Sequence, residues 1–121
     1  MRRVYVGDFH IGTEEKQAVI EVLDSGRISE GKKVNEFEKI WAKYIGTKHC
    51  VAISSGTASL MSGWSALREY KKYGNKKMKV ITSPLTYIAT SNALITTGFE
   101  PVYVDIDPIT FTITPDTIKD H

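Results

Sequence analysis

Disulfides, membrane spans and secretion signals are the first features that the sequence lacks. It has one cysteine, Cys50, among 121 residues, so no disulfide can form within the chain. No apolar run approaches the roughly 20 residues that a membrane-spanning helix needs, and the first residues lack the apolar segment of a signal peptide. We therefore expect a cytoplasmic protein in which Cys50 is a buried structural thiol.

An excess of charge of either sign is also absent. Sixteen basic and 14 acidic side chains leave a net charge of +2, which is too small to predict a nucleic acid or a membrane surface as a partner. One basic cluster flanks Gly74 and Asn75, and we interpret it as a solvated helix end and loop. It comprises Arg68, Lys71, Lys72, Lys76, Lys77 and Lys79.

The histidines and acidic residues do not predict a metal site. The three histidines lie far apart in the sequence, without the spacing of metal ligands. Asp105 and Asp107 precede Pro108, so we interpret these two carboxylates as parts of a turn.

Two helix patterns fill the first part of the sequence. Thr13 can cap a first helix, which Gly26 terminates. The predicted inner face of this helix consists of Ala18, Val19 and Leu23. A second helix is predicted over residues 33–45 and ends at Gly46. Its apolar stripe consists of Val34, Phe37, Trp41 and Tyr44.

Strand and helix patterns alternate in the remainder. Short apolar runs predict strands over 50–53, 78–82 and 101–105. Between them, helices are predicted from Thr57 onward and over 87–96. Strands separated by helices favour a mainly parallel sheet flanked by helices, which is an α/β fold.

The ends of the chain bear on its domain organisation. Val4 to Val6 are predicted to form a short extended arm, and a last helix begins at about Asp116 without a stop signal. We therefore interpret the chain as the front part of a larger, incomplete α/β domain. Residues 1–47 form its arm and first helices, and residues 48–121 begin its sheet.

The turn Ser54-Ser55-Gly56-Thr57 joins the first predicted strand to the helix after it. The first amides of a helix lack intrahelical partners and the helix dipole adds positive charge, so this corner favours a phosphate or a carboxylate. Gly56 allows the anion to approach closely, and the hydroxyl groups can add donors. Ordinary turn and N-cap chemistry without a ligand explains the same residues, because the turn matches neither the Walker A pattern nor Gly-x-Gly-x-x-Gly.

Five segments, in order over nearly the whole chain, resemble blocks of one family. They cover residues 12–26, 31–38, 54–60, 84–90 and 98–107. They include a Gly-x-x-Val-x-x-Phe-Glu signature and a Ser-Gly-Thr-Ala turn. Together they resemble the pyridoxal-phosphate-dependent aminotransferases of nucleotide-sugar biosynthesis, the DegT/DnrJ/EryC1/StrS family. One block is a weak signal, whereas five in the right order and spacing are a strong one.

The resemblance implies a fold, a cofactor and a set of binding residues. The fold is the N-terminal part of the fold-type-I large domain, usually found in homodimers with active sites at the subunit interface. The cofactor is pyridoxal 5'-phosphate, whose phosphate would be held by Gly56, Thr57 and Ala58, and whose ring would stack on Tyr87. Ser29 and Glu30 lie in a loop that contacts substrate in relatives. The alternatives are a core aromatic for the tyrosine and a plain surface loop for the pair.

The resemblance also implies a reaction. An amino group would pass from an amino acid, usually glutamate, to a keto-sugar nucleotide in polysaccharide, lipopolysaccharide or amino-sugar biosynthesis. The Schiff-base lysine and the aspartate that pairs with the pyridinium nitrogen lie downstream in the family, so we expect this chain alone to be inactive. The alternatives are a sugar dehydratase of the same family and a non-catalytic α/β binding or regulatory module.

Overall fold

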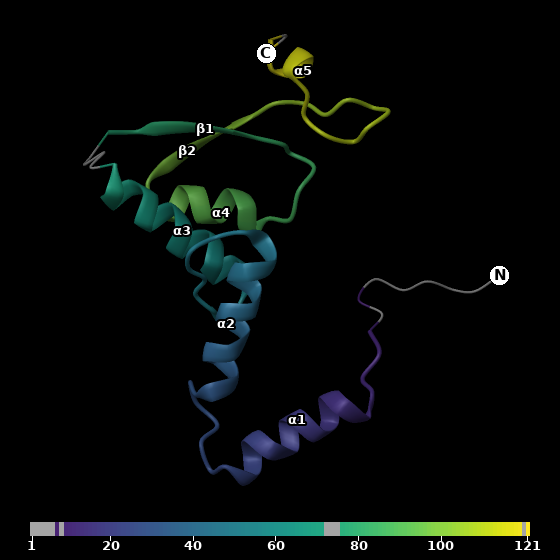
Figure 1. Ribbon diagram of the computed structural model, residues 1–121. Coiled ribbons are helices and arrows are strands. Elements are labelled where there is room, and N and C mark those ends of the chain that lie inside the picture. The colour runs from purple at the N-terminus through teal and green to yellow at the C-terminus, as the bar shows by residue number, and fades with distance from the viewer. Residues whose placement is uncertain (1–6, 8, 72–75, 120) are drawn as a thin grey trace, which may run out of the picture. The chain divides into compact units, whose positions relative to one another are not determined.

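The computed structural model describes residues 7, 9–71, 76–119 and 121 (Figure 1). The chain divides into two compact units, Met1–Ala52 and Ile53–His121. The predicted arm at residues 4–6 and the centre of the predicted basic loop at 72–75 lie outside the described residues. No described helix combines the length and the apolar character that crossing a membrane requires.

The first unit contains two helices, α1 (Thr13–Asp24) and α2 (Lys32–Ile45). The cap of α1 is Gly12 rather than the predicted Thr13, because the Gly12 amide donates to the Glu15 carboxylate at 2.7 Å and Thr13 is already helical. The predicted ends of both helices are confirmed. Gly26 and Gly46 have φ of +68° and +74°, the left-handed conformation in which glycine commonly ends a helix.

The predicted inner faces of these helices are covered only in part, since Ala18 and Val34 are half-buried. Val19 and Leu23 of α1 are 60% and 58% exposed, so their prediction as buried residues is wrong. On α2, the ring of Trp41 packs against Phe37 and Tyr44 with centroid distances of 5.9 and 5.5 Å, yet all three rings remain exposed. The helices have amphipathic sequences, but the described residues of this unit supply no further layer to cover their apolar faces.

The second unit is built around two parallel strands, β1 (Met78–Thr82) and β2 (Phe99–Tyr103). Helix α4 (Ala89–Thr96) connects them. The prediction of β1 is confirmed residue for residue, whereas β2 begins and ends two residues earlier than predicted. In the register of the pair, Val80 lies opposite Pro101.

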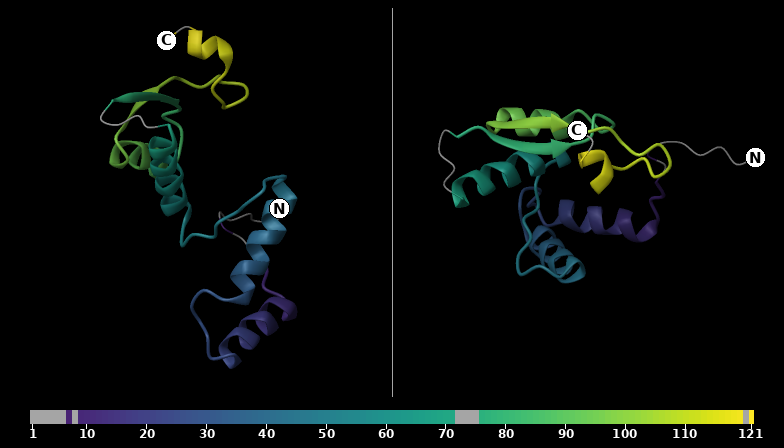
Figure 2. Two further views of the ribbon diagram at one scale, coloured as in Figure 1. Left: turned by 60° about the vertical axis from the view of Figure 1, so that its left-hand side comes forward. Right: turned by 90° about the horizontal axis from the view of Figure 1, so that it is seen from above.

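Helices α3 (Gly56–Tyr70) and α5 (Pro115–Lys119) complete the second unit. Helix α4 packs on β2, and α3 packs on α4. Figure 2 shows α3 and α4 on the same side of the sheet. The core lies between these elements and consists of Ala89, Ser91, Ala93, Leu94, Phe99 and Val104.

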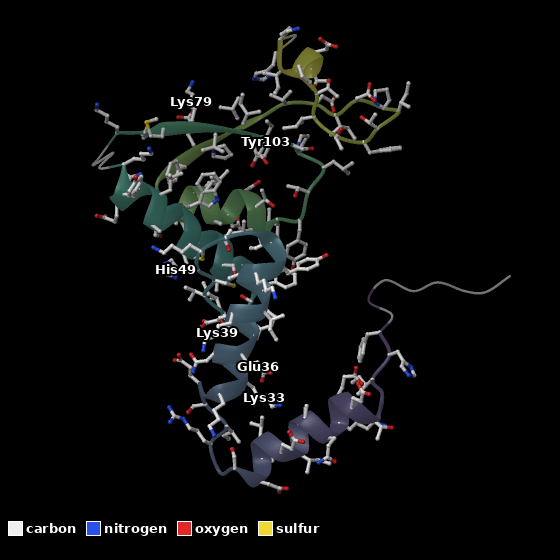
Figure 3. The ribbon with its side chains drawn as sticks, viewed as in Figure 1. Lys33, Glu36, Lys39, His49, Lys79 and Tyr103 are labelled. Atoms are coloured by element: carbon white, nitrogen blue, oxygen red, sulfur yellow. The ribbon has the colours of Figure 1, made fainter. Side chains whose placement is uncertain are left out.

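The opposite side of the sheet is uncovered in the described structure. Lys79 points away from α4 (Figure 3) and lies 3.9 Å from the carboxylate of Glu100 on β2, with both side chains exposed. Ile81, two residues further along β1, is 47% exposed. Because alternate residues of a strand share a face, β1 buries one face only.

The predicted strand over 50–53 is absent from the described structure. These residues are irregular, Val51 is 73% exposed, and Cys50 is half-buried rather than buried as predicted. A strand is defined by hydrogen bonds to a neighbouring strand, and the described residues form one sheet of two strands. The segment is tied instead to α2, because the Ala52 amide donates to the Glu38 carboxylate at 2.8 Å.

Arg68 was predicted to lie in a solvated cluster, and this prediction is wrong. Its guanidinium donates to the backbone oxygens of Gly98 and Thr97 at 2.9 and 3.4 Å, and lies 5.8 Å from the centre of the Phe99 ring. One turn earlier on α3, Trp64 packs on the same ring at 5.2 Å. We call this group, Trp64, Arg68, Gly98 and Phe99, the arginine latch.

Candidate functional site

The corner that precedes α3 has the geometry of a capped helix. Ser55 is extended, with φ of −161° and ψ of 162°, and its hydroxyl oxygen accepts from the Ala58 amide at 3.2 Å. The Ser59 hydroxyl donates to the Ser55 carbonyl at 3.0 Å. The N-cap interpretation of this turn is therefore confirmed for Ser55, and it accounts for the amide of Ala58.

The cap leaves two amides of the corner available. The N–H groups of Gly56 and Thr57 belong to the first turn, where no intrahelical acceptor exists, and no other described residue accepts from them. A Cβ atom placed on Gly56 would meet nothing within 4 Å, so the space beside these amides is open. These two amide donors suit an anion of phosphate size, and the Thr57 hydroxyl and the dipole of a 15-residue helix add to their effect.

Tyr87 lies in the segment between β1 and α4, two residues before the helix. The prediction that the helix begins at Tyr87 is wrong, because α4 starts at Ala89. The tyrosine side chain is 77% exposed and does not belong to the core of the described residues. Its carbonyl accepts from the Thr90 amide at 3.0 Å.

The fold brings the start of α3 and the Tyr87 segment to the same end of the sheet. Both α3 and α4 begin at the end where β1 and β2 finish (Figures 1 and 2). Ligands of α/β folds bind beyond the carboxyl ends of parallel strands. The two predicted parts of the cofactor site therefore lie where the architecture favours a ligand.

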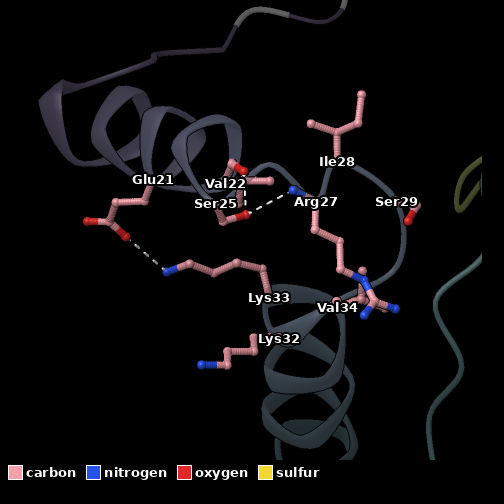
Figure 4. A pocket seen from close by; sticks show the side chains of 10 residues that line it. Glu21, Val22, Ser25, Arg27, Ile28, Ser29, Lys32, Lys33 and Val34 are labelled. Carbon is pink, nitrogen blue, oxygen red and sulfur yellow. Dashed lines mark hydrogen bonds and ion pairs between the residues drawn. The ribbon is translucent and has the colours of Figure 1, made fainter.

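A pocket of about 590 Å³ lies in the first unit, between the end of α1 and the start of α2 (Figure 4). Ser29, which the sequence singled out, lines it, whereas Glu30 is not among the lining side chains. Glu30 contributes its carbonyl, which accepts from the Arg27 side chain at 2.8 Å. Arg27 is fixed further because its amide donates to the Ser25 hydroxyl at 3.3 Å.

The lining of this pocket combines apolar and cationic side chains with one acidic side chain, Glu21. Its apolar members are Val22, Ile28 and Val34, and its cationic members are Arg27, Lys32 and Lys33. Lys33 also lies 3.5 Å from the carboxylate of Glu21 across the pocket rim. The sequence analysis missed the cationic residues of the pocket. The signal for them is their place in the sequence, because Arg27 precedes Ser29 and Glu30 in the same loop, and Lys32 and Lys33 follow that loop directly.

Asp107 has the structural role that the sequence predicted. Its carboxylate accepts from the amides of Thr110 and Ile109 at 2.7 and 3.0 Å, and from the Thr110 hydroxyl at 3.0 Å. The bonds from Thr110 hold the pKa of Asp107 below its ordinary value, and burial opposes them only in part. These bonds close the turn after β2.

Comparisons with known proteins show what the chain is similar to. The sequence profile of the DegT/DnrJ/EryC1/StrS aminotransferase family matches residues 10–121. The spore coat polysaccharide biosynthesis protein SpsC of Bacillus subtilis is 48% identical over 87% of this chain and 26% of its own length. The 3-oxo-glucose-6-phosphate:glutamate aminotransferase of the same organism is 38% identical over 83% of this chain and 22% of its own length.

The solved structures give the same picture. The E. coli GDP-4-keto-6-deoxy-D-mannose-3-dehydratase with bound hydrated pyridoxal phosphate aligns with a TM-score of 0.86 and 29% identity. The alignment covers 93% of this chain and 29% of that one. This chain spans about a quarter of the length of the curated relatives that it matches.

Proposed function

The chain belongs to the DegT/DnrJ/EryC1/StrS aminotransferase family, and we propose that it is the N-terminal part of a pyridoxal-phosphate-dependent sugar aminotransferase. The predicted fold is confirmed, since the structure is an incomplete α/β domain of the kind found in the aminotransferase structures. The reaction we propose transfers an amino group from an amino acid, glutamate, to a keto-sugar nucleotide. The observation that carries the proposal is the open pair of amides at the start of α3, within the family match.

We propose that Gly56 and Thr57 hold the cofactor phosphate through their amides and the Thr57 hydroxyl. The fit rests on the donor set, because amide and hydroxyl groups at a helix start are the donors that a phosphate dianion requires. The Ala58 amide already donates to Ser55. Ala58 therefore contributes to the phosphate site indirectly, because its bond to Ser55 keeps the first turn of α3 in place.

We propose that the Tyr87 side chain stacks on the pyridine ring of the cofactor. An exposed ring on a segment that forms no tertiary hydrogen bond with any described residue can turn to meet a flat ligand. When bound, pyridoxal phosphate supplies an electron-withdrawing ring at which the amino group is exchanged. The residues of this chain bind and orient that ring, and the proton transfer belongs to a lysine that the family carries downstream.

We propose that the pocket at Ser29 and Glu30 takes part of the sugar nucleotide. Its cationic side chains, Arg27 and Lys32 among them, suit a diphosphate, and its apolar wall suits the flat face of a sugar or base. The Glu30 carbonyl orients Arg27 for that contact. In this proposal the active enzyme is a homodimer, as its family generally is.

A spectroscopic experiment tests the proposed function. The longer protein that contains this chain, incubated with pyridoxal phosphate, should show an absorbance band in the visible or near-ultraviolet range that borohydride removes. The 121-residue chain alone should show no such band. Absence of the band from the longer protein would contradict the aminotransferase proposal.

A second candidate follows from the likeness to the E. coli dehydratase. A dehydratase of this family would bind the same cofactor with the residues of this chain, so the choice between the two depends on the downstream sequence. A lysine at the Schiff-base position favours the aminotransferase, and another residue there favours the dehydratase.

A matched pair of variants tests the phosphate site. Thr57→Val removes a hydroxyl donor and should weaken binding of pyridoxal phosphate by about tenfold, the effect of about 1.4 kcal/mol. Ser62→Ala, further along α3, removes a hydroxyl outside the corner and should leave the affinity unchanged. Equal affinities for the two variants would place the phosphate elsewhere.

A further inference from the structure

The arginine latch joins α3 to the far end of α4. Arg68 donates to the Gly98 and Thr97 carbonyls, which belong to the carboxyl end of α4, where the dipole favours a cation. Gly98 has φ of +82°, and a Cβ atom placed there would lie 2.7 Å from the Arg68 guanidinium nitrogen. The latch therefore requires glycine at position 98 and a long side chain at position 68.

The latch lies at the opposite end of both helices from the proposed cofactor site. At a rise of 1.5 Å per residue, Gly56 lies roughly 18 Å back along α3 from Arg68, and Ala89 lies roughly 12 Å back along α4 from Thr97. The helices run in the same direction (Figure 1). Their starts therefore differ by roughly 6 Å along the axes. Tyr87 recovers roughly 3 Å of this difference, because Ile88 is helical and the Tyr87 carbonyl accepts from the Thr90 amide, so the two residues before Ala89 continue the helical rise.

The segment that carries Tyr87 does not fix its own position against α3. Within the described part of the chain its hydrogen bonds are local: the Leu85 amide donates to the Ser83 hydroxyl at 3.0 Å, and the hydroxyls of Thr86 and Thr90 lie 3.0 Å apart. The spacing between the start of α3 and Tyr87 is thus set by how α3 and α4 pack, and the latch is the polar anchor of that packing.

We propose that Arg68 is a positioning residue for the cofactor site. By holding α3 against the end of α4, it sets the distance between the amides of Gly56 and Thr57 and the ring of Tyr87. This inference rests on the proposed function, since it assumes that the amides of Gly56 and Thr57 bind the cofactor phosphate and that the Tyr87 ring stacks on the pyridine ring.

The test measures cofactor binding in the longer protein that contains this chain. Titration with pyridoxal phosphate gives the affinity, and circular dichroism of the bound cofactor reports the orientation of its ring. Arg68→Ala should weaken the affinity by about fivefold and reduce the dichroic band by about half. Arg68→Lys, which keeps one cationic donor, should recover most of both.

A control separates positioning from general stability. Val80→Ala removes half-buried side-chain volume from the middle of β1, away from both the latch residues and the strand ends, so it should lower the Tm and leave the dichroism per bound cofactor unchanged. If Arg68→Ala does not fold, Gly98→Ala displaces the guanidinium instead and should reduce the dichroic band in the same way.

The outcomes distinguish the two proposals. Normal affinity and dichroism in Arg68→Ala, with binding by the wild type, would overturn the positioning role alone. The same would follow if Val80→Ala changed the dichroism as much as Arg68→Ala. No cofactor binding by the wild type would overturn the proposed function and this inference with it.

Discussion

In the second unit, Ala93, Leu94 and Val104 are at most 1% exposed, whereas in the first unit Val19 and Leu23 keep more than half of their surface exposed. Both units have helices with apolar faces. The second unit also has a strand-helix-strand arrangement, in which the sheet covers one face of α4. Two consecutive helices without a sheet have no such layer, so a helical pattern alone does not make a core.

The comparison shows which part of the chain buries its apolar side chains by itself. A hydrophobic pattern identifies the face that a helix will bury, but the covering partner must come from elsewhere in the protein or from another molecule. The first unit has helices with an exposed apolar face, whereas the second unit has both an apolar helix face and the sheet that covers it. Four predictions test this contrast.

Truncation of a leucine in each unit should have the largest difference in effect. Leu94→Ala opens a cavity in the core and should lower the free energy of unfolding of the 121-residue chain by about 3 kcal/mol. Leu23→Ala, at a side chain that is 58% exposed, should cost less than about 1 kcal/mol. Urea unfolding followed by circular dichroism measures both. Equal costs would mean that α1 is covered in solution.

Replacing each of two helix-ending glycines by alanine compares backbone strain alone with backbone strain plus steric crowding by a side chain. Gly98→Ala meets both the positive φ and the Arg68 guanidinium, and should lower the free energy of unfolding by about 2 kcal/mol. Gly26→Ala has a positive φ but open space around it, and should cost about 1 kcal/mol. Thermal unfolding measures the difference, which Arg68→Ala should abolish.

The exposed rings of α2 should make the 121-residue chain associate with itself. Trp41→Ser removes the central ring of the stripe and should lower the association constant by about tenfold, or about 1.4 kcal/mol. Tyr70→Ser, at a 78% exposed ring of the second unit, is the matched control and should leave association unchanged. Sedimentation velocity over a range of concentrations decides between these results, and a monomer at all concentrations would contradict the prediction.

The smallest effect concerns the turn that Asp107 closes in the second unit. Its pKa is lowered from the ordinary value of 3.8 in the folded chain. The carboxylate therefore stabilises the fold above the unfolded pKa, and this contribution is lost as the pH falls through the folded value. An NMR titration of the Asp107 carboxyl carbon should give a midpoint below 3.8, and Thr110→Val should raise it. An unchanged midpoint in that variant would assign the shift to another group.

Local signals predicted the elements that local chemistry determines. Gly26 and Gly46 end their helices in the left-handed conformation that the sequence indicated. The strand β1 matches its predicted range because Pro84 stops the ladder shortly after it. The phosphate corner was predicted from its residue types, and the structure adds which of its amides the serine cap occupies.

Features that depend on distant parts of the chain could not be predicted. A run of apolar residues at 50–53 is the right composition for a strand, but a strand also needs a neighbour that the described residues do not supply. Arg68 belongs by sequence to a run of basic residues, and only the packing of α3 on α4 places its guanidinium on the Gly98 carbonyl. The hydropathy pattern around Arg68 does not reveal a contact with a residue that lies 30 positions away in the sequence.

The placement of Pro101 opposite Val80 determines on which side the sheet can grow. The Val104 amide donates to Thr82 of β1, and amides alternate in direction along a strand, so the nitrogen of residue 101 faces away from β1. Proline has no hydrogen on that nitrogen. The outer border of β2 thus lacks a donor in the middle of its ladder, and an additional strand would join the sheet beside β1.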